Sequence, residues 1–219
     1  MKNITPFSPK EYNQEIRKRV PFYDAIQQAV LDVVHTIQPN PRNWADLGCG
    51  TGDFIDKARS YFPNVCYMLA DPSEEMLSMA RERIGVDKYT RYIKDSSEAI
   101  VMEQDTCDVI TAILSHHYLR PQNKAQVAKK CYKALRSGGV YVCVENTLPA
   151  TKQGENVGMK RWQRFQEEQG GLVETGDRQG TMYFPVTTEE QIQILHQSGF
   201  QAVEPFWLTY MQAGFFCIK

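Results

Sequence analysis

The sequence predicts an α/β protein with a doubly wound, mostly parallel seven-stranded sheet, helices on both faces and an antiparallel strand at the C-terminal end. In the middle of the chain, apolar strand-like runs alternate with helical stretches of about 10 to 15 residues, which is typical of βαβ units and a parallel sheet. The last two strand-like runs, 201–209 and 211–218, are almost adjacent. Because a parallel crossover needs about a dozen residues or more, these two strands must pair as an antiparallel hairpin.

The individual elements follow from the spacing of apolar residues and from the helix and turn signals between them. The N-terminal part predicts two helical pieces within 11–37, and the second is expected to begin at Pro21 and to end before Pro39. Strands are expected at 43–47, 65–70, 89–94, 107–114 and 140–145, and helices at 52–61, 73–84, 96–102, 121–135 and 188–197. The Ser-Gly-Gly run at 137–139 is expected to form a turn before the fifth strand.

The 219 residues show no repeat or long linker, so we expect a single domain over 1–219. Its parts would be an N-terminal helical cap (1–40), a ligand-binding core (41–146), an insert or lid (147–186), and a final helix with hairpin (187–219). The insert contains a predicted amphipathic helix in which Trp162 and Phe165 share one side. These two are expected to pack in a core or a dimer contact rather than to touch substrate. The glycine-rich stretch 170–180 is a candidate lid.

Composition and charge exclude several classes of protein. Hydrophobic residues make up 42% and charged residues 23% of the chain, which rules out a largely disordered protein. With 25 Lys+Arg against 26 Asp+Glu, binding to nucleic acid through bulk charge is not expected. The longest apolar runs, 109–114 and 140–144, are far shorter than the roughly 20 residues that cross a bilayer. No signal-peptide core is visible, and the six cysteines lack metal-like spacing. We therefore expect a cytoplasmic protein with reduced thiols and no metal site.

The most informative segment is the glycine-rich loop at 48–52, where a short buried strand runs directly into a helix. Such a loop offers free backbone N–H groups and lets a ligand approach the main chain. A dinucleotide site would have its third glycine where this chain has Asp53, and the Gly-Lys-Ser/Thr of a nucleoside-triphosphate loop is missing. Asp46, two residues before the first glycine, would meet a pyrophosphate badly but suits a ligand that carries an ammonium group.

The run Asp-Leu-Gly-Cys-Gly-Thr-Gly at 46–52 resembles the first motif of the class I S-adenosylmethionine (SAM) methyltransferases. The resemblance covers about residues 40–146, and the C-terminal hairpin extends it to 218. It implies SAM as cofactor, S-adenosylhomocysteine as product, and an enzyme that transfers a methyl group. Asp71 and Asp95 end the second and third strands, where that family places carboxylates for the ribose hydroxyls and the adenine amino group. Taken alone, either aspartate is more often a helix N-cap.

The resemblance also implies which residues hold the cofactor and which face the methyl acceptor. The predicted cofactor residues are Asp46, Gly48, Cys49, Gly50, Gly52, Asp71, Pro72, Met76, Asp95, Ser96, Ser115, Arg19 and Tyr23. The loop after the fourth strand would face the acceptor, and His116 or His117 is a candidate general base because imidazole titrates near neutral pH. Tyr210 is the third catalytic candidate. Tyr210, Tyr23 and His117 are expected to surround the methyl acceptor. For each ring, simple packing is the alternative.

Two segments outside the motif resemble a narrower family, the carboxy-SAM synthases that serve wobble-uridine modification of tRNA. Residues 19–23, Arg-Val-Pro-Phe-Tyr, resemble an N-terminal segment of that family, and 206–216 resemble its final hairpin. That family has a Gly-Cys-Ser loop, whereas this chain has Gly-Cys-Gly-Thr-Gly. The family also holds the carboxyl group of its cofactor with an arginine, and the nearby candidate, Arg178, does not align without a gap.

We therefore predict a SAM-dependent methyltransferase that acts on an O, N or S atom of a small molecule. The alternatives are a carboxy-SAM synthase-like enzyme and a non-catalytic SAM-binding protein. A nucleic-acid methyltransferase is disfavoured, because Leu-Ser-His-His at 114–117 stands where an Asn/Asp-Pro-Pro-Tyr/Phe motif would be. No membrane partner is expected, and a homodimer is left open.

Overall fold

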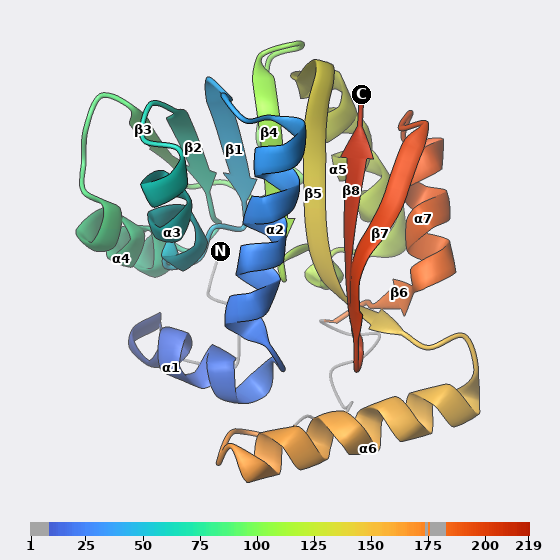
Figure 1. The fold of residues 1–219 in the computed structure, drawn as a ribbon. Helices are drawn as coiled ribbons and strands as arrows, with labels where there is room; N and C mark the ends of the chain where they lie inside the picture. The colour runs from blue at the N-terminus through green and yellow to red at the C-terminus, as the bar shows by residue number, and fades with distance from the viewer. Residues whose placement is uncertain (1–8, 174, 176–182) are drawn as a thin grey trace.

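Parallel strands form most of a single sheet in the computed structural model, which describes residues 9–173, 175 and 183–219 (Figure 1). The strand order is β3-β2-β1-β4-β5-β8-β7, and β6 pairs with the end of β5 in addition to the seven strands predicted. The strands are β1 (Asn43–Leu47), β2 (Cys66–Ala70), β3 (Thr90–Ile93), β4 (Cys107–Ile113), β5 (Leu135–Leu148), β6 (Val186–Thr187), β7 (Ala202–Thr209) and β8 (Gln212–Ile218). β1 to β5 run parallel, and β8 is antiparallel to both β5 and β7. The predicted fold class is confirmed.

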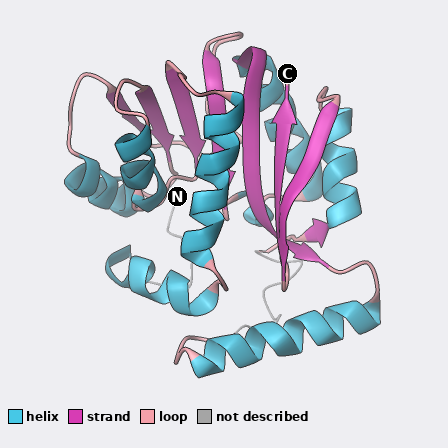
Figure 2. Ribbon diagram, viewed as in Figure 1, coloured by secondary structure: helices cyan, strands magenta, loops and turns pink. Residues whose placement is uncertain are grey.

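Helices cover both faces of this sheet (Figure 2). They are α1 (Pro9–Arg19), α2 (Tyr23–Ile37), α3 (Asp53–Tyr61), α4 (Glu74–Ile84), α5 (Pro121–Ala134), α6 (Lys152–Glu168) and α7 (Thr188–Gln197), with one 3-10 turn, η1 (His116–Tyr118). Buried residues of α2, α3 and α4 pack on one face, and those of α5 and α7 on the other. Along β5, Val140, Val142 and Val144 belong to the first core and Tyr141 and Cys143 to the second, because successive strand side chains point to opposite faces.

Two helices lie beyond the carboxyl ends of the parallel strands, at the lower edge of the sheet in Figure 1. α1 lies below β1 and β2, and α6 crosses beneath the end of the C-terminal hairpin. Trp162 of α6 is 2% exposed, and its Nε1 donates to the carbonyl oxygen of Arg19 at 2.6 Å. Gln166 donates to the same oxygen at 3.2 Å. Open α/β sheets bind ligands at this edge, so α1 and α6 are placed to roof a site.

The predicted helix at 96–102 is wrong. A single turn forms there, in which the N–H groups of Ala99 and Ile100 donate to the carbonyl of Ser96 at 3.0 and 2.9 Å. Ile100 is buried, but Val101 next to it is 86% exposed. A short helix is marginal unless one face packs against the protein, and this segment packs against the core only through Ile100 and Met102.

Two boundaries also differ from the prediction. β5 begins at Leu135, which pairs with Cys107 of β4, and continues through the expected turn, where Gly138 N donates to the carbonyl of Lys219 at 2.7 Å. α2 begins at Tyr23 rather than Pro21, since Phe22 adopts a left-handed conformation with φ of 60° and breaks the helical path.

Some predictions fall on parts of the chain that the structure does not describe. Most of the glycine-rich stretch 170–180, and Arg178 within it, lie outside the described residues. Among the described residues, no helix has the length and apolar character needed to cross a bilayer.

Candidate functional site

The glycine loop joins the end of β1 to the start of α3. The N–H groups of Gly48 and Cys49 donate to the carbonyl of Ala70 at 2.8 and 3.0 Å, which fixes the loop against β2. Gly48 has φ of +78°, and a Cβ built there would lie 2.4 Å from the Cβ of Ser115, so only glycine fits. A Cβ at Gly50 would meet no heavy atom within 4 Å. The main chain at Gly50 therefore faces open space that a ligand can enter.

Asp71 follows β2 and faces the glycine loop. Its Oδ2 accepts a hydrogen bond from Gly50 N at 3.0 Å, and its Oδ1 accepts one from Ser73 N at 2.8 Å. Burial raises the pKa of Asp71, and these two N–H groups oppose the rise. Each carboxylate oxygen can accept a second hydrogen bond. Asp71 can therefore receive two more donors, as the vicinal hydroxyls of a ribose would supply.

Asp46, near the end of β1, is held by a buried hydrogen-bond chain. The Thr111 hydroxyl donates to Asp46 Oδ1 at 2.6 Å and accepts from Trp44 Nε1 at 2.9 Å. Burial raises the pKa of Asp46 to about 7, although the bond from Thr111 lowers it. A positive group placed beside this carboxyl would favour its ionised form and bind in return.

A small cavity lies between the glycine loop and the N-terminal cap. Its lining includes Tyr12 of α1, Tyr23 of α2, Asp46 and residues of the loop. The cap is tied to the loop at two points. The Thr51 hydroxyl donates to the Asn13 side chain at 2.6 Å, and the Arg17 guanidinium lies 3.1 Å from Asp53 Oδ2.

These groups fit a ligand that carries an ammonium and vicinal hydroxyls. Within the described part of the chain, neither Asp46 nor Asp71 forms an ion pair. Buried carboxylates ordinarily require a positive partner or several hydrogen bonds. Two such carboxylates beside an open glycine loop match the methionine and ribose parts of SAM.

Three further residues predicted to touch the cofactor lie at neighbouring strand ends. Asp95 follows β3, and its Oδ1 accepts from Ser96 N at 2.9 Å, so this pair forms a local turn. The Ser115 hydroxyl donates to the carbonyl of Leu47 at 2.8 Å and joins the ends of β1 and β4. The structure thus brings the ends of β1, β2, β3 and β4 to one edge, as the sequence predicts for the core of the site.

Of the other predicted cofactor residues, some line the cavity and others pack elsewhere. Tyr23 is 8% exposed and lines the cavity. Met76 is buried in α4 and belongs to its packed side, and Pro72 is half-buried beside Asp71. Arg19 contributes its carbonyl oxygen to α6, as described above, and does not line the cavity.

His117 is held by a carboxylate that the sequence reasoning did not single out. Its Nδ1 lies 3.1 Å from Oε2 of Glu145, at the carboxyl end of β5, and both residues are buried. The His117 ring packs against Tyr118 and Tyr183, with centroid distances of 4.4 and 5.3 Å. A charged residue at the end of an apolar strand was the signal in the sequence that could have drawn attention to Glu145.

His116 has no such arrangement. Its Nδ1 lies 3.0 Å from the Tyr141 hydroxyl and its Nε2 lies 3.1 Å from the Ser97 hydroxyl, so both ring nitrogens are engaged. Burial lowers the pKa of His116 to about 4. The geometry gives this ring a packing role and does not support the predicted role as a base.

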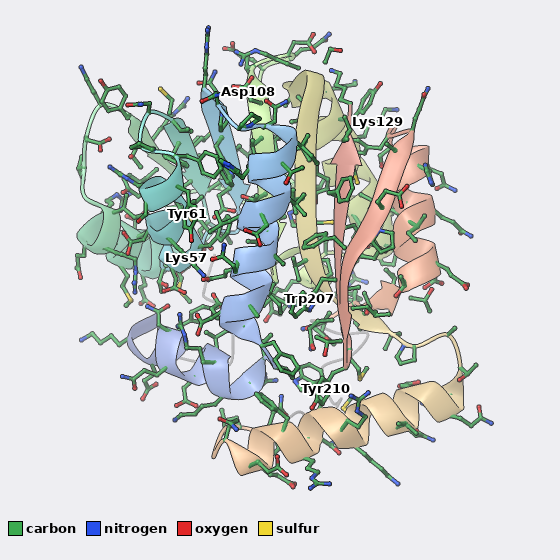
Figure 3. All side chains as sticks on the ribbon, in the orientation of Figure 1. Lys57, Tyr61, Asp108, Lys129, Trp207 and Tyr210 are labelled. Carbon is green, nitrogen blue, oxygen red and sulfur yellow. The ribbon has the colours of Figure 1, made fainter. Side chains whose placement is uncertain are left out.

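Tyr210 lies apart from the cofactor cavity, in the turn between β7 and β8 (Figure 3). Its ring packs near Phe22 and Phe165, and the Arg161 guanidinium sits 4.4 Å from the ring centroid. It lines a second, larger cavity of about 510 Å³ between the end of β5, α6 and the start of α7. The structure therefore brings Tyr23, but not Tyr210, to the glycine loop. Tyr12 was missed, because nothing in its local sequence marks it.

Comparison with known proteins relates part of the chain to methyltransferases. Residues 45–139 match the family profile of the methyltransferase domain. This part of the chain is therefore similar to a methyltransferase domain, and the similarity supports SAM as the cofactor, as the sequence predicts.

Among individual proteins, the curated relatives are carboxy-S-adenosyl-L-methionine synthases. That of Campylobacter curvus is 25% identical over 208 residues, covering 91% of this chain and 88% of the relative. That of Methylococcus capsulatus is 22% identical over 219 residues, covering 95% and 89%.

Solved structures show the same fold. DesVI of Streptomyces venezuelae has a TM-score of 0.71 at 15% identity, covering 95% of this chain and 97% of that one. Human N-acetylserotonin methyltransferase, solved in complex with SAM, has a TM-score of 0.62 at 14% identity. The match covers 95% of this chain and 57% of the human enzyme, so this chain spans little more than half of that protein.

Proposed function

We propose that this protein transfers a methyl group from SAM to an O, N or S atom of a small molecule. The observation that carries the proposal is the pair of buried carboxylates beside the open main chain of Gly50. Asp46 would pair with the ammonium of the methionine part, and Asp71 would accept from the ribose hydroxyls. Asp95 and Ser96, at the end of β3, would contact the adenine.

Bound there, SAM supplies a methyl group already activated by a positively charged sulfur, so the protein has to align the acceptor, exclude water and accept a proton where one is released. We assign the proton to His117. Tyr118, which packs on His117, is near enough to add to the burial-driven rise in the pKa of Tyr12, a residue of the cofactor cavity. Tyr210 would contact the acceptor from the larger cavity, and His116 is left out of the proposal.

The test is transfer from SAM labelled on its methyl group to a fractionated extract of small metabolites, with release of S-adenosylhomocysteine measured in parallel. Label in a small molecule supports the proposal. Tight SAM binding without transfer to any fraction would favour a non-catalytic SAM-binding protein. Failure to bind SAM would contradict the site itself.

Synthesis of carboxy-SAM is the second candidate, because relatives of that name align over nine-tenths of this chain. The glycine loop departs from the loop of that family, which favours plain methyl transfer. Mass spectrometry of the nucleoside that co-purifies with the protein separates the two candidates. A species heavier than SAM by one carboxyl group would favour the synthase, and SAM or S-adenosylhomocysteine the methyltransferase.

We further propose that the chain acts as one domain, with 1–40 and 147–186 closing over the core. Its partner would be a small molecule rather than nucleic acid, and a homodimer remains to be tested. All six cysteines are free thiols, which agrees with a reducing, cytoplasmic location. Sedimentation of the purified protein would test the dimer, and a salt-dependent shift with tRNA would revive nucleic acid as a partner.

A further inference from the structure

Two buried polar atoms of the C-terminal hairpin have no hydrogen-bond partner. In the described part of the chain, Nε1 of Trp207 on β7 and Oε1 of Gln212 on β8 are shielded from solvent and unpaired. The whole of Gln212 is 0% exposed. A third such atom, Oε1 of Gln191, lies on α7. Because the great majority of buried polar atoms in folded proteins are hydrogen-bonded, two unpaired atoms on one hairpin indicate that a ligand or a buried water completes them.

The two unpaired atoms belong to neighbouring side chains on one face of the hairpin. In the β7–β8 ladder, Trp207 pairs with Gly214, and Thr209 pairs with Gln212. Directly paired residues point to the same face of a sheet, and so does every second residue along a strand. Trp207 and Gln212 are therefore diagonal neighbours, which typically lie about 7–8 Å apart. A group of a few atoms placed between the two side chains can reach both.

Neighbouring residues hold both side chains in place. Gly214 leaves room for the aromatic residues of β7, since a Cβ there would lie 2.7 Å from the ring of Phe206 and 3.1 Å from the Cβ of Trp207. Nε2 of Gln212 donates to Oδ1 of Asn146 on β5 at 3.1 Å. This bond uses the amino end of the Gln212 amide, so its oxygen is the end that is left for another molecule.

These side chains lie beside the cofactor cavity, on the side of β5. Ile113 of β4 lines that cavity and pairs with Val144 of β5. Asn146, which binds Gln212, is two residues beyond Val144 on the same face, a distance of about 7 Å along a strand. The two carboxylates that would hold the cofactor lie at the ends of β1 and β2. The ends of β5 and β8 are therefore left for the methyl acceptor.

The unpaired atoms determine which chemical group fits between them. An indole N–H can only donate and an amide oxygen can only accept, so the ligand must supply one acceptor and one donor. Trp207, Gln212 and Asn146 are uncharged, and among the described residues they form no ion pair. An ionised ligand group would be buried here without a partner of opposite charge, which is costly. A carboxamide meets these conditions, because it is uncharged and has its N–H donor and C=O acceptor side by side.

We propose that Trp207 and Gln212 bind an uncharged, carboxamide-like group of the methyl acceptor, with Asn146 orienting the Gln212 amide. The proposal rests on the proposed function, because it names the class of molecule that receives the methyl group. The indole N–H donates to the carbonyl oxygen of the ligand, and Oε1 of Gln212 accepts from its N–H. The rings of Phe22 and Tyr210, with centroids 6.3 Å apart, lie near the turn of the hairpin and offer apolar surface to the rest of the ligand.

The test uses benzamide as probe and the indole N–H signal of Trp207 as reporter in NMR of the full chain. The chain has three tryptophans; Trp44 donates to Thr111 and Trp162 to the Arg19 carbonyl, and Trp207→Phe identifies the third signal (Trp207 is labelled in Figure 3). With S-adenosylhomocysteine present, benzamide should shift this signal in a saturable way. Benzoate, which has nearly the same shape but a negative charge, should bind at least about tenfold more weakly.

A variant of Gln212 tests the second contact. Gln212→Met keeps the length of the side chain but removes the acceptor, so benzamide should bind about tenfold more weakly. The matched control is Gln201→Met, at an exposed glutamine just before β7, which should bind benzamide as the unaltered protein does. Equal affinity for benzamide and benzoate, no shift of the Trp207 signal, or unchanged binding in Gln212→Met overturns the proposal. So does a bound water that stays in contact with the Trp207 N–H when benzamide is present, because that water would then complete the site.

If Gln212→Met fails to fold, as judged by the dispersion of backbone amide signals, Trp207→Phe serves in its place. Binding is then followed on the signals of benzamide itself, and a comparable loss is expected because the indole N–H is gone. The binding result is independent of the transfer assay. Benzamide binding without methyl transfer to any fraction would refute the proposed function alone, and methyl transfer by a protein that does not prefer benzamide to benzoate would refute this inference alone.

Discussion

Replacing Asp71 by asparagine should weaken the binding of SAM by about 10- to 100-fold while leaving the protein folded. Both oxygens of Asp71 already accept one backbone N–H, at 3.0 and 2.8 Å, and each has one further lone pair. A hydrogen bond to a charged group contributes about 1.5–3 kcal/mol. Asparagine keeps one acceptor oxygen but loses the charge and the second acceptor, so the loss is about one such bond, and 1.4 kcal/mol corresponds to a tenfold change in Kd.

The assay is isothermal titration calorimetry with SAM and S-adenosylhomocysteine, and a thermal melt of the ligand-free protein controls for folding. Asp56→Asn, an exposed aspartate of the adjacent helix α3, is the matched control and should bind as the unaltered protein does. If Asp71→Asn melts normally and binds both ligands with unchanged Kd, the ribose does not lie on Asp71 and the placement of the cofactor is refuted.

Four further predictions concern the site and the helix that covers it. Because burial raises the pKa of Asp46 to about 7, its carboxyl is protonated below that pH and must lose the proton to pair with the ammonium. SAM affinity should therefore fall by up to about tenfold per pH unit below 7, and Asp46→Asn should abolish that slope in calorimetry. The same raised pKa means that the contribution of Asp46 to the stability of the ligand-free protein is greatest below about pH 4 and is lost as pH rises through 7. Denaturant unfolding at pH 5 and 8 should show this loss, and its absence in Asp46→Asn would confirm the source. Gly50→Ala should fold, with a cost of about 1–2 kcal/mol for its left-handed backbone, yet lose SAM binding. Gly48→Ala should be more destabilised, since its Cβ would lie 2.4 Å from Ser115, and equal melting temperatures for the two would contradict this contrast. Trp162→Phe should lower the free energy of unfolding by about 1 kcal/mol in urea, because the bond to the Arg19 carbonyl is lost while Gln166 still donates to it. No change would show that the indole N–H contributes nothing.

The parts of the fold that the sequence predicted are those in which local pattern and tertiary packing agree. β1 matches its predicted range 43–47 and α7 its range 188–197, since each is an apolar run bounded by strong turn or cap signals. The predicted helix at 96–102 failed because only Ile100 and Met102 of this segment pack against the core, which is too little to stabilise a short helix. β5 extends five residues earlier than predicted, because the two partners that lengthen it, Cys107 of β4 and Lys219, are far away in sequence.

In the candidate site too, the sequence predicted what a local motif defines and missed what contacts between distant residues define. The glycine loop, Asp46 and Asp71 could be found because a contiguous motif and strand ends place them together. Glu145 and Lys124 could not be joined to His117, because their contacts cross from β5 and α5 to η1 and leave no periodic signature. Tyr210 was expected beside Tyr23, but the αL turn at Tyr210 directs its ring toward α6.

The hydrogen bond that the Arg19 carbonyl accepts from α6 bears on when, during synthesis, the protein can bind its cofactor. The donor that meets it, Trp162, is 143 positions further along the chain. Contacts between such distant residues form only after a long loop has closed, which is entropically costly and slow. During synthesis the glycine loop is complete long before α6 has been made, so a nascent chain has the floor of the pocket without its roof. Only the finished chain should therefore retain SAM tightly. The tightness of SAM binding would then report whether the last third of the chain has folded.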